Sequence, residues 1–204
     1  MRARELSIHG AWEFIPDLHP DARGTFSNPY VAANVSAVVG RALAVAQTNH
    51  AVSARGVVRG VHYALVPPGQ AKYVYCPHGR ALDIVVDVRV GSPTYGRHDV
   101  VTLDGSTAHA IYLAEGLGHV VIALADDTVT SYLCSTAYDP DREHGLDPLD
   151  PELALPIPRD MPLVLSDRDR TAPTLAQARA AGLLPDYRAS VAASDEPIDE
   201  RLAR

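Results

Sequence analysis

Eight short segments rich in Val, Ile, Tyr and Thr constrain the fold of this chain more than any other feature of its sequence. Residues of these β-branched and aromatic types favour strands. Turn residues separate the segments, as in PPG (67–69) and GSPTYG (91–96), which is typical of strands joined by short connections. The predicted strands cover residues 43–52, 56–65, 71–76, 81–90, 99–103, 110–114, 119–124 and 128–136.

The spacing of these segments predicts how the strands are arranged. They recur about every 8–12 residues, a spacing typical of β-sandwiches and barrels. Helical segments do not alternate with them, which disfavours a parallel sheet built from βαβ units. We therefore predict an all-β fold, a cupin jelly-roll barrel with short peripheral helices.

Two segments outside this region have helical character. Residues 31–39 predict a short helix that ends at Gly40. Residues 174–182 predict a second helix, with Thr174 as its N-cap and Gly182 as its C-cap.

The length and the composition of the ends predict one domain. A chain of 204 residues can bury a core of its own, and we assign residues 1–187 to a single domain. Residues 139–173 are rich in proline and aspartate, so irregular chain is expected to wrap the barrel there. Residues 188–204 are polar and are expected to form a frayed C-terminal tail.

Composition narrows the class of protein further. The N-terminus lacks the apolar stretch of a secretory signal, and the longest apolar runs are far shorter than the ~20 residues of a membrane span. The two cysteines, Cys76 and Cys134, do not form a CxxC motif, which predicts reduced thiols and a cytoplasmic protein. A net charge of −7 argues against a nucleic-acid partner, and no membrane partner is expected.

One lysine stands out among the cationic residues. Of 18 lysines and arginines, only Lys72 is a lysine. A bias towards arginine can come from genomic base composition alone. A lysine retained against such a bias also indicates a site that needs a compact ammonium close to a single oxygen, which a planar guanidinium cannot supply.

Two of the nine histidines, His62 and His119, lie near the ends of predicted strands and can line one cavity. Metal binding in a cupin needs further ligands close to His62, but Gly60 stands two residues before it. Two histidines alone make a poor divalent-metal site, so no metal is expected. General acid–base chemistry is the alternative, because an imidazole ordinarily titrates near neutral pH.

A histidine base needs partners, and the sequence offers several. Asp167 or Asp169 can orient the imidazole, and Lys72, ten residues after His62, can supply positive charge. Tyr132 offers a phenol for proton transfer, although a barrel-lining aromatic residue would also fit its position. Arginines beside turns can hold an anion such as phosphate through side chains, since the chain has neither a Walker loop nor a GxGxxG motif. These are Arg23, Arg55, Arg59 and Arg168.

Eight motifs follow one another in order over about residues 4–187. They are DARGTF (21–26), AQTNHAVS (46–53), RGVVRGVHY (55–63), PPGQAKYV (67–74), DIVVDVRVGSPTYG (83–96), GLGH (116–119), YLCSTAYDPDREHG (132–145) and LSDRD (165–169). Taken together, these motifs resemble the dTDP-4-dehydrorhamnose 3,5-epimerase family. Within it, some stretches are similar to the 5-epimerases of antibiotic deoxysugar pathways.

The resemblance implies a metal-free, cofactor-free homodimer that inverts C5, or C3 and C5, of a dTDP-4-keto-6-deoxyhexose through an enolate. It implies His62 as the base, Asp169 as its partner, Tyr132 as the opposing acid and Lys72 beside the C4 oxygen. It also implies substrate contacts, which fall on Arg23, Phe26, Asn28, Gln47, Asn49, Arg59, His119, Tyr138, Glu143 and Arg168.

The sequence also departs from the family pattern in two places. Asn28 occupies a position at which many members carry an acid, and Val120–Val121 follows His119 where many read Gly-Phe. An aromatic residue missing there reshapes the sugar pocket. A C3-only epimerase, a dTDP-sugar 3,4-ketoisomerase and a non-catalytic nucleotide-sugar binder therefore remain as alternatives.

Overall fold

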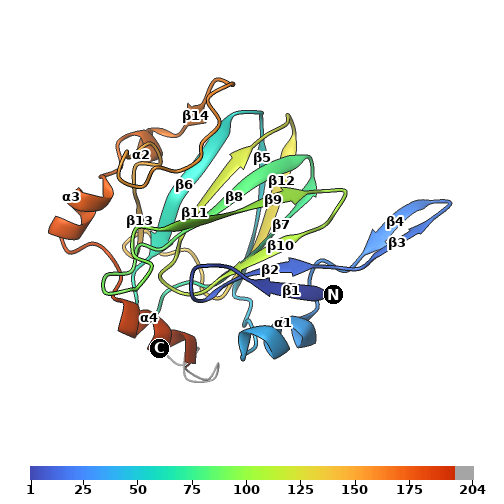
Figure 1. Ribbon diagram of the computed structural model, residues 1–204, viewed down its shortest axis with the longest axis horizontal. Coiled ribbons are helices and arrows are strands. Elements are labelled where there is room, and N and C mark those ends of the chain that lie inside the picture. The colour runs from blue at the N-terminus through green and yellow to red at the C-terminus, as the bar shows by residue number, and fades with distance from the viewer. Residues whose placement is uncertain (196–204) are drawn as a thin grey trace.

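The computed structural model describes residues 1–195, and two facing β-sheets form the body of the molecule (Figure 1). Except for the β8–β9 hairpin, successive strands from β5 to β12 switch from one sheet to the other, which is the arrangement of a jelly roll. The first sheet runs in the order β1 (Arg2–Glu5), β2 (Ala11–Ile15), β10 (Ala110–Leu113), β7 (Lys72–His78), β12 (Thr128–Cys134) and β5 (Gln47–Ser53). The second runs β13 (Glu143–Gly145), β6 (Val57–Ala64), β11 (Gly118–Ala123), β8 (Arg80–Val86) and β9 (His98–Asp104), with β14 (Val164–Leu165) parallel to β6.

All eight predicted strands are confirmed, within a few residues at their ends. The largest difference at a C-terminal end is in β8, which stops at Val86 instead of residue 90. The cause lies in Asp87, whose buried carboxylate accepts hydrogen bonds from Arg89 at 2.8 and 2.9 Å and from Ser92 at 2.6 Å. These local bonds turn the chain away from the ladder.

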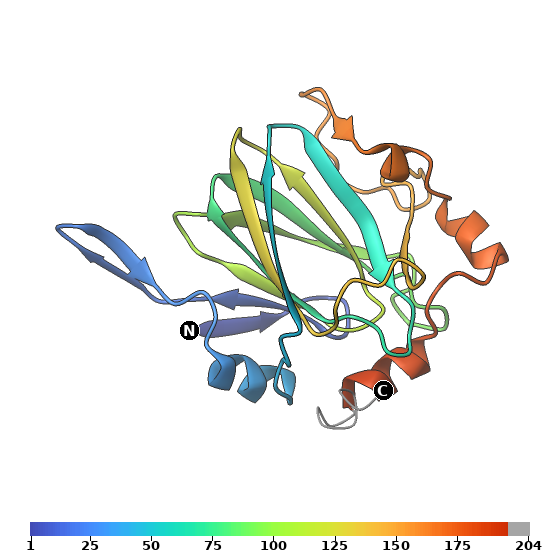
Figure 2. The same cartoon turned by 180° about the vertical axis from the view of Figure 1, so that it is seen from behind.

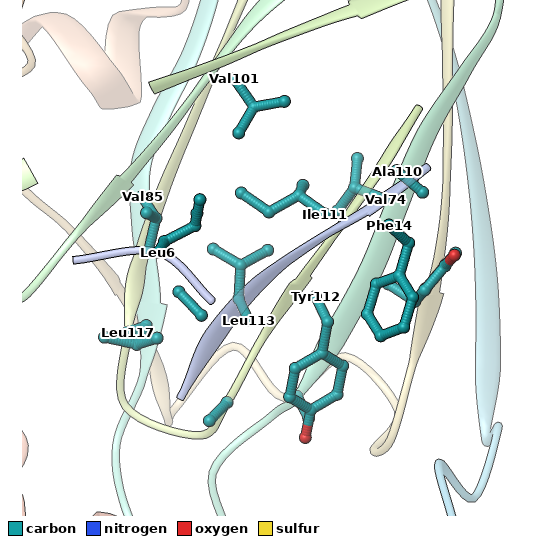
Figure 3. Packing of buried hydrophobic residues seen from close by; sticks show 14 of the residues in the cluster. Leu6, Phe14, Val74, Val85, Val101, Ala110, Ile111, Tyr112, Leu113 and Leu117 are labelled. Carbon is teal, nitrogen blue, oxygen red and sulfur yellow. The ribbon is translucent and has the colours of Figure 1, made fainter. Parts of the chain in front are cut away.

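The hydrophobic core fills the space between the sheets. Val74 and Ile111 are partners in the β7–β10 ladder, and both are fully buried together with Val85 of the opposite sheet (Figure 3). Each such side chain contributes about 1.5–3 kcal/mol through burial. A second cluster lies under the C-terminal helices and includes Tyr63 and Leu175. These two hydrophobic clusters hold the central strands in place. The same strands carry His62, Lys72 and Tyr132, the candidate site residues.

The two predicted helices are present. Helix α1 (Ala32–Val39) ends at Gly40, whose φ of 84° is the left-handed conformation that glycine accommodates. Helix α3 (Leu175–Ala180) starts at Thr174, which forms a capping box with Gln177. Its C-cap is Ala181, one residue before the predicted Gly182, which follows in the left-handed conformation.

The predicted frayed tail is wrong for residues 188–195, because these form most of helix α4 (Tyr187–Asp195). Ser190 is completely buried, and its hydroxyl donates to the Asp186 carbonyl at 2.7 Å. Small residues such as Ala193 let helix α4 pack closely against the rest of the protein. The polar composition of this segment therefore did not prevent it from forming a packed helix. The remainder of the predicted tail, residues 196–204, lies outside the described residues.

Four strands before residue 41 were not predicted. Two of them, β3 (Leu18–Asp21) and β4 (Gly24–Ser27), form a hairpin that projects away from the two main sheets (Figures 1 and 2). Its residues are exposed or nearly so, and within residues 1–195 the two strands pair only with each other. None of the helices described over this range is long and apolar enough to cross a membrane.

Candidate active site

A histidine–carboxylate pair connects the second sheet to a short helix. The Nε2 atom of His62, on β6, is 2.6 Å from Oδ1 of Asp169, on helix α2 (Asp167–Arg170). Ser166 caps this helix by accepting a bond from the Asp169 N–H at 3.1 Å, which places the Asp169 side chain inward. Asp169 is the partner, since the side chain of Asp167 is fully exposed.

The Asp169 carboxylate is held in its charged form. Burial raises its pKa, but hydrogen bonds from His62 and from the Gly60 N–H, together with the charge of His62, lower it by more, so the net pKa falls below the ordinary value. A carboxylate with a lowered folded-state pKa stabilises the fold above the unfolded-state value, and this stabilisation is lost as the pH falls through the folded-state pKa. The pair is therefore intact at neutral pH.

His119, the second candidate histidine, lies directly beside the first. It is the partner of His62 in the β6–β11 ladder, next to a bulge between His119 and Val121. Gly60 makes this close approach possible: its φ is 124°, and a Cβ there would lie 2.3 Å from the His119 carbonyl oxygen. The Nε2 atom of His119 is 2.9 and 3.0 Å from the two oxygens of Asp83, on β8.

Asp83 is a site residue that sequence reasoning missed. Its side chain is completely buried and faces His119 from the neighbouring strand. The available signal was an acid inside the otherwise apolar run ALDIVVDV, because a buried carboxylate requires a partner. Its role in holding His119 became visible only when residues 83 and 119 were brought together in space.

Lys72 starts β7 and is buried, with 8% of its surface exposed. Burial lowers the pKa of its ammonium, while the acidic groups of Glu143 and Asp83 oppose the shift. A partly desolvated cation acts on a nearby oxyanion more strongly than one in water. The structure therefore places the only lysine of the chain among the polar groups of the barrel interior.

Tyr132 lies on β12, between Asn49 of β5 and Val74 of β7 in the ladder. Burial raises the pKa of its phenol, with the Arg59 charge acting in the opposite direction. The phenol is therefore protonated at neutral pH and available as a proton donor. Lys72 lies on the neighbouring strand β7, so the two side chains share one sheet and come from adjacent strands.

The predicted substrate-binding residues on β5 and in the loop after β12 form one hydrogen-bond chain. The Tyr138 backbone N–H donates to Oε1 of Gln47 at 2.8 Å, and Nε2 of Gln47 donates to Oδ1 of Asn49 at 2.8 Å. The Tyr138 ring is half exposed, as a surface for stacking would be.

Three further predicted residues lie around this loop and β6. Arg168, on α2, donates to the Glu143 backbone carbonyl at 2.7 Å and reaches the Tyr138 hydroxyl at 3.4 Å. Arg59, on β6, donates to the Ser53 hydroxyl at 3.1 Å. The Arg168 guanidinium beside the exposed Tyr138 ring is suited to a nucleotide with a charged phosphate group.

Four residues singled out from the sequence lie elsewhere in this chain. Arg23, Phe26 and Asn28 belong to the projecting hairpin or follow it directly, and all three are exposed. Arg55 lies in the turn between β5 and β6, where its guanidinium is 3.9 Å from Asp160. The geometry within one chain does not bring these residues to the histidine–carboxylate pair.

The arrangement has the groups needed to move a proton on and off carbon. It combines an oriented imidazole, a buried ammonium and a protonated phenol on the rigid strands of one barrel. Among residues 1–195, no group of three or more His, Cys, Asp or Glu side chains is arranged to hold a metal ion.

Comparison with known proteins agrees with this chemistry. A family model described as dTDP-4-dehydrorhamnose 3,5-epimerase matches residues 5–177. The chain belongs to the dTDP-4-dehydrorhamnose 3,5-epimerase family. A dTDP-4-dehydrorhamnose 3,5-epimerase of Mycolicibacterium smegmatis is 51% identical over 187 residues, which is 92% of each chain.

Solved members of the epimerase family share the fold. NovW, a 4-keto-6-deoxy sugar epimerase from the novobiocin gene cluster of Streptomyces spheroides, is 50% identical, with a TM-score of 0.90 over 93% of this chain and 95% of that one. ChmJ, a 3'-monoepimerase of Streptomyces bikiniensis solved with dTDP-quinovose, is 47% identical, with a TM-score of 0.91 over 97% and 98%. The predicted membership, with its antibiotic-pathway relatives, is confirmed. The roles of individual residues remain predictions.

Proposed function

We propose that this protein epimerises a dTDP-4-keto-6-deoxyhexose at C5, or at C3 and C5, in the biosynthesis of a deoxysugar for a natural product. One observation carries the proposal: the 2.6 Å bond between His62 and Asp169 in the barrel that also holds Lys72 and Tyr132. Membership of an epimerase family supports it. A protein that only bound the nucleotide sugar would need no such set of proton-transfer groups.

The first half of the reaction is proton abstraction. Nε2 of His62 is engaged with Asp169, so Nδ1 is the nitrogen that takes the proton from the carbon next to the C4 ketone. The C–H electron pair forms a C=C bond, and the carbonyl π electrons move to the C4 oxygen, which gives an enolate. Asp169 stabilises the imidazolium, and Lys72 stabilises the oxyanion.

The second half delivers a proton to the opposite face of the enolate. One imidazole cannot easily serve both faces, so a second acid is needed. Tyr132 is the candidate, because its phenol is protonated and comes from the sheet that faces His62. Its proton goes to the carbon, the C4 carbonyl re-forms, and exchange with solvent restores the phenol and the imidazole.

Deuterium exchange tests this function directly. The protein is incubated with dTDP-4-keto-6-deoxyglucose in D₂O, and the C3 and C5 proton signals are followed by NMR. Exchange at C5, or at C3 and C5, is the expected result. Exchange at C3 alone would favour the C3-only reaction, which the name of the 3'-monoepimerase relative makes the second candidate. An absence of exchange at both carbons with the nucleotide sugar bound would contradict the enolate mechanism.

Replacing Tyr132 by phenylalanine should separate exchange from inversion. His62 can still remove the proton, so we expect deuterium to enter at carbon with retention of configuration. Net inversion should fall by about 10²–10⁴-fold, the usual contribution of a positioned acid. NMR of the recovered sugar measures both quantities on one sample. Inversion at the wild-type rate would show that another group is the acid.

We further propose that the protein acts as a homodimer in which the projecting hairpin completes the partner's site. The Arg23 side chain is 89% exposed and bonds only locally, to Asp21, while Phe26 is 63% exposed. The first sheet ends at β5, which carries Gln47 and Asn49 at a strand edge. An open edge of this kind accepts a strand from another chain. A hairpin paired there would bring Arg23 towards those two residues.

Mixing two inactive variants should test this dimer. Arg23→Glu and His62→Ala are prepared alone and then co-expressed, so that mixed dimers form. One site of each mixed dimer keeps both native residues, and random pairing restores about a quarter of the wild-type activity. If each chain carried a complete site, the mixture would show no activity beyond the average of the two parents. Sedimentation confirms that both variants dimerise.

A further inference from the structure

Cys134 lies at the centre of the proposed site, but the mechanism above gives it no part. It is completely buried at the end of β12. In the ladder it stands directly between Gln47 of β5 and Lys72 of β7. Tyr132 precedes it by two residues on the same strand, so both side chains face the same side of the sheet.

The hydrogen-bond chain from the Tyr138 loop ends on the sulfur of this cysteine. A backbone N–H can only donate, so the bond from Tyr138 N–H fixes the Gln47 oxygen as its acceptor. The Gln47 amide nitrogen must then donate, which fixes the Asn49 oxygen as the next acceptor. The Asn49 amide nitrogen is left to donate, and it lies 3.6 Å from Sγ of Cys134, a normal length for a sulfur acceptor.

The thiol accepts this bond without carrying charge. Burial raises the pKa of Cys134 to about 11, although Lys72 and the Asn49 bond act in the opposite direction. A neutral sulfur beside Lys72 does not form an ion pair with it, so the ammonium keeps its full charge for a substrate oxygen. A carboxylate at this position would compete for that charge.

We propose that Cys134 is a positioning residue: its sulfur holds the Asn49 amide nitrogen in place and so anchors the hydrogen-bond chain that runs through Gln47 to the Tyr138 loop, for binding of the dTDP-sugar. This inference rests on the proposed function and adds a residue that acts through the binding groups. Without the acceptor, the Asn49 side chain is held only through its oxygen, and the chain loses its anchor on β12.

Substitutions at Cys134 test the acceptor role. Cys134→Ala should raise KM for the nucleotide sugar, and Kd for dTDP, about three- to tenfold, the range that one hydrogen bond typically supplies. The value of kcat should change less than about twofold, because the bond acts in binding. Cys134→Ser keeps an acceptor and should restore both constants. If the alanine variant does not fold, Cys134→Val replaces it, since valine also lacks an acceptor and favours strands.

The matched control is Cys76→Ala, which removes the other buried thiol of the chain. Cys76 lies on β7 and donates to the His78 carbonyl at 3.0 Å, away from the Gln47–Asn49 chain. Its substitution should leave KM and the dTDP Kd unchanged. An equal effect from both cysteine variants would mean a general packing defect and would overturn the proposal.

A double-mutant cycle with Asn49→Ala decides whether Cys134 acts through Asn49. If it does, the double variant has the same KM as Asn49→Ala alone. Additive effects would overturn the inference. Failure of the proposed function is a separate outcome: the wild-type protein would then show no exchange in D₂O, whereas the dTDP affinities of the cysteine variants can still be compared by calorimetry.

Discussion

His62→Ala should lower turnover by about 10²–10⁴-fold, the effect of removing a general base, and it should also stop deuterium exchange at carbon. The protein should stay folded, because Asp169 keeps its bonds with Ser166 and with the Gly60 N–H. The His62 side chain is itself partly exposed, so its loss leaves little unfilled space. NMR measures the rate of deuterium exchange, and circular dichroism checks that the variant is folded.

Two further variants complete this experiment: Asp169→Asn tests the partner of His62, and His109→Ala is the control. The asparagine variant keeps the size of the side chain but cannot stabilise an imidazolium, so we expect a loss of similar order. His109 also contacts a carboxylate, with its Nδ1 atom 3.0 Å from Glu13, but Glu13 lies on β2 and His109 directly precedes β10, in the other sheet from His62. Its substitution should leave turnover unchanged. Substantial activity in His62→Ala would sink the enolate mechanism with this base.

Lys72→Met should lower kcat by about 10²–10³-fold, the usual loss when one donor to an oxyanion is removed. Lys72→Arg should not restore the rate, because a guanidinium cannot occupy the same buried position as a compact ammonium. Arg80→Met removes an exposed cation at the start of β8 and is the control for charge alone. Single-turnover kinetics separates the chemical step from binding. A kcat within a few-fold of the wild-type value would exclude Lys72 from the oxyanion site.

The same lysine predicts the alkaline limb of the pH profile. Burial lowers the pKa of Lys72 below its ordinary value of 10.5, and the protonated form is the active one. Activity therefore declines as the pH rises through a value below 10.5. The pKa of Tyr132 is raised, so the phenol does not account for this limb. Exchange in Tyr132→Phe should keep the limb, whereas the residual activity of Lys72→Met should lack it.

The central strands of the barrel were predictable because buried apolar residues and turn residues both mark them in the local sequence. In β6 and β11, apolar residues such as Val58 and Val120 are buried, and turn residues mark the ends of the strands. Two of the four N-terminal strands lacked that signal. β1 and β3 are exposed along their whole length, so neither shows an alternation of apolar and polar residues. Their pairing depends on neighbouring strands rather than on their own composition.

The site was predictable only in part. His62, Lys72 and Tyr132 were identified from residue types and from the family motifs. The sequence alone could not choose between Asp167 and Asp169, since the choice depends on the inward side of a single helical turn. Asp83 was not identified, because its contact with His119 spans 36 residues of chain.

The placement of the proposed reactive groups on strands, and of the proposed nucleotide-binding Tyr138 in a loop, has a consequence for how the protein can change. His62, Lys72 and Tyr132 are fixed by ladders and by two cores, whereas Tyr138 belongs to the loop that follows β12. Loops accept substitutions with less disturbance of the rest of the fold than strands do. Selection for a new nucleotide can therefore act on that loop while the chemical step is inherited unchanged. Binding preference and reaction type become separately adjustable traits of one barrel.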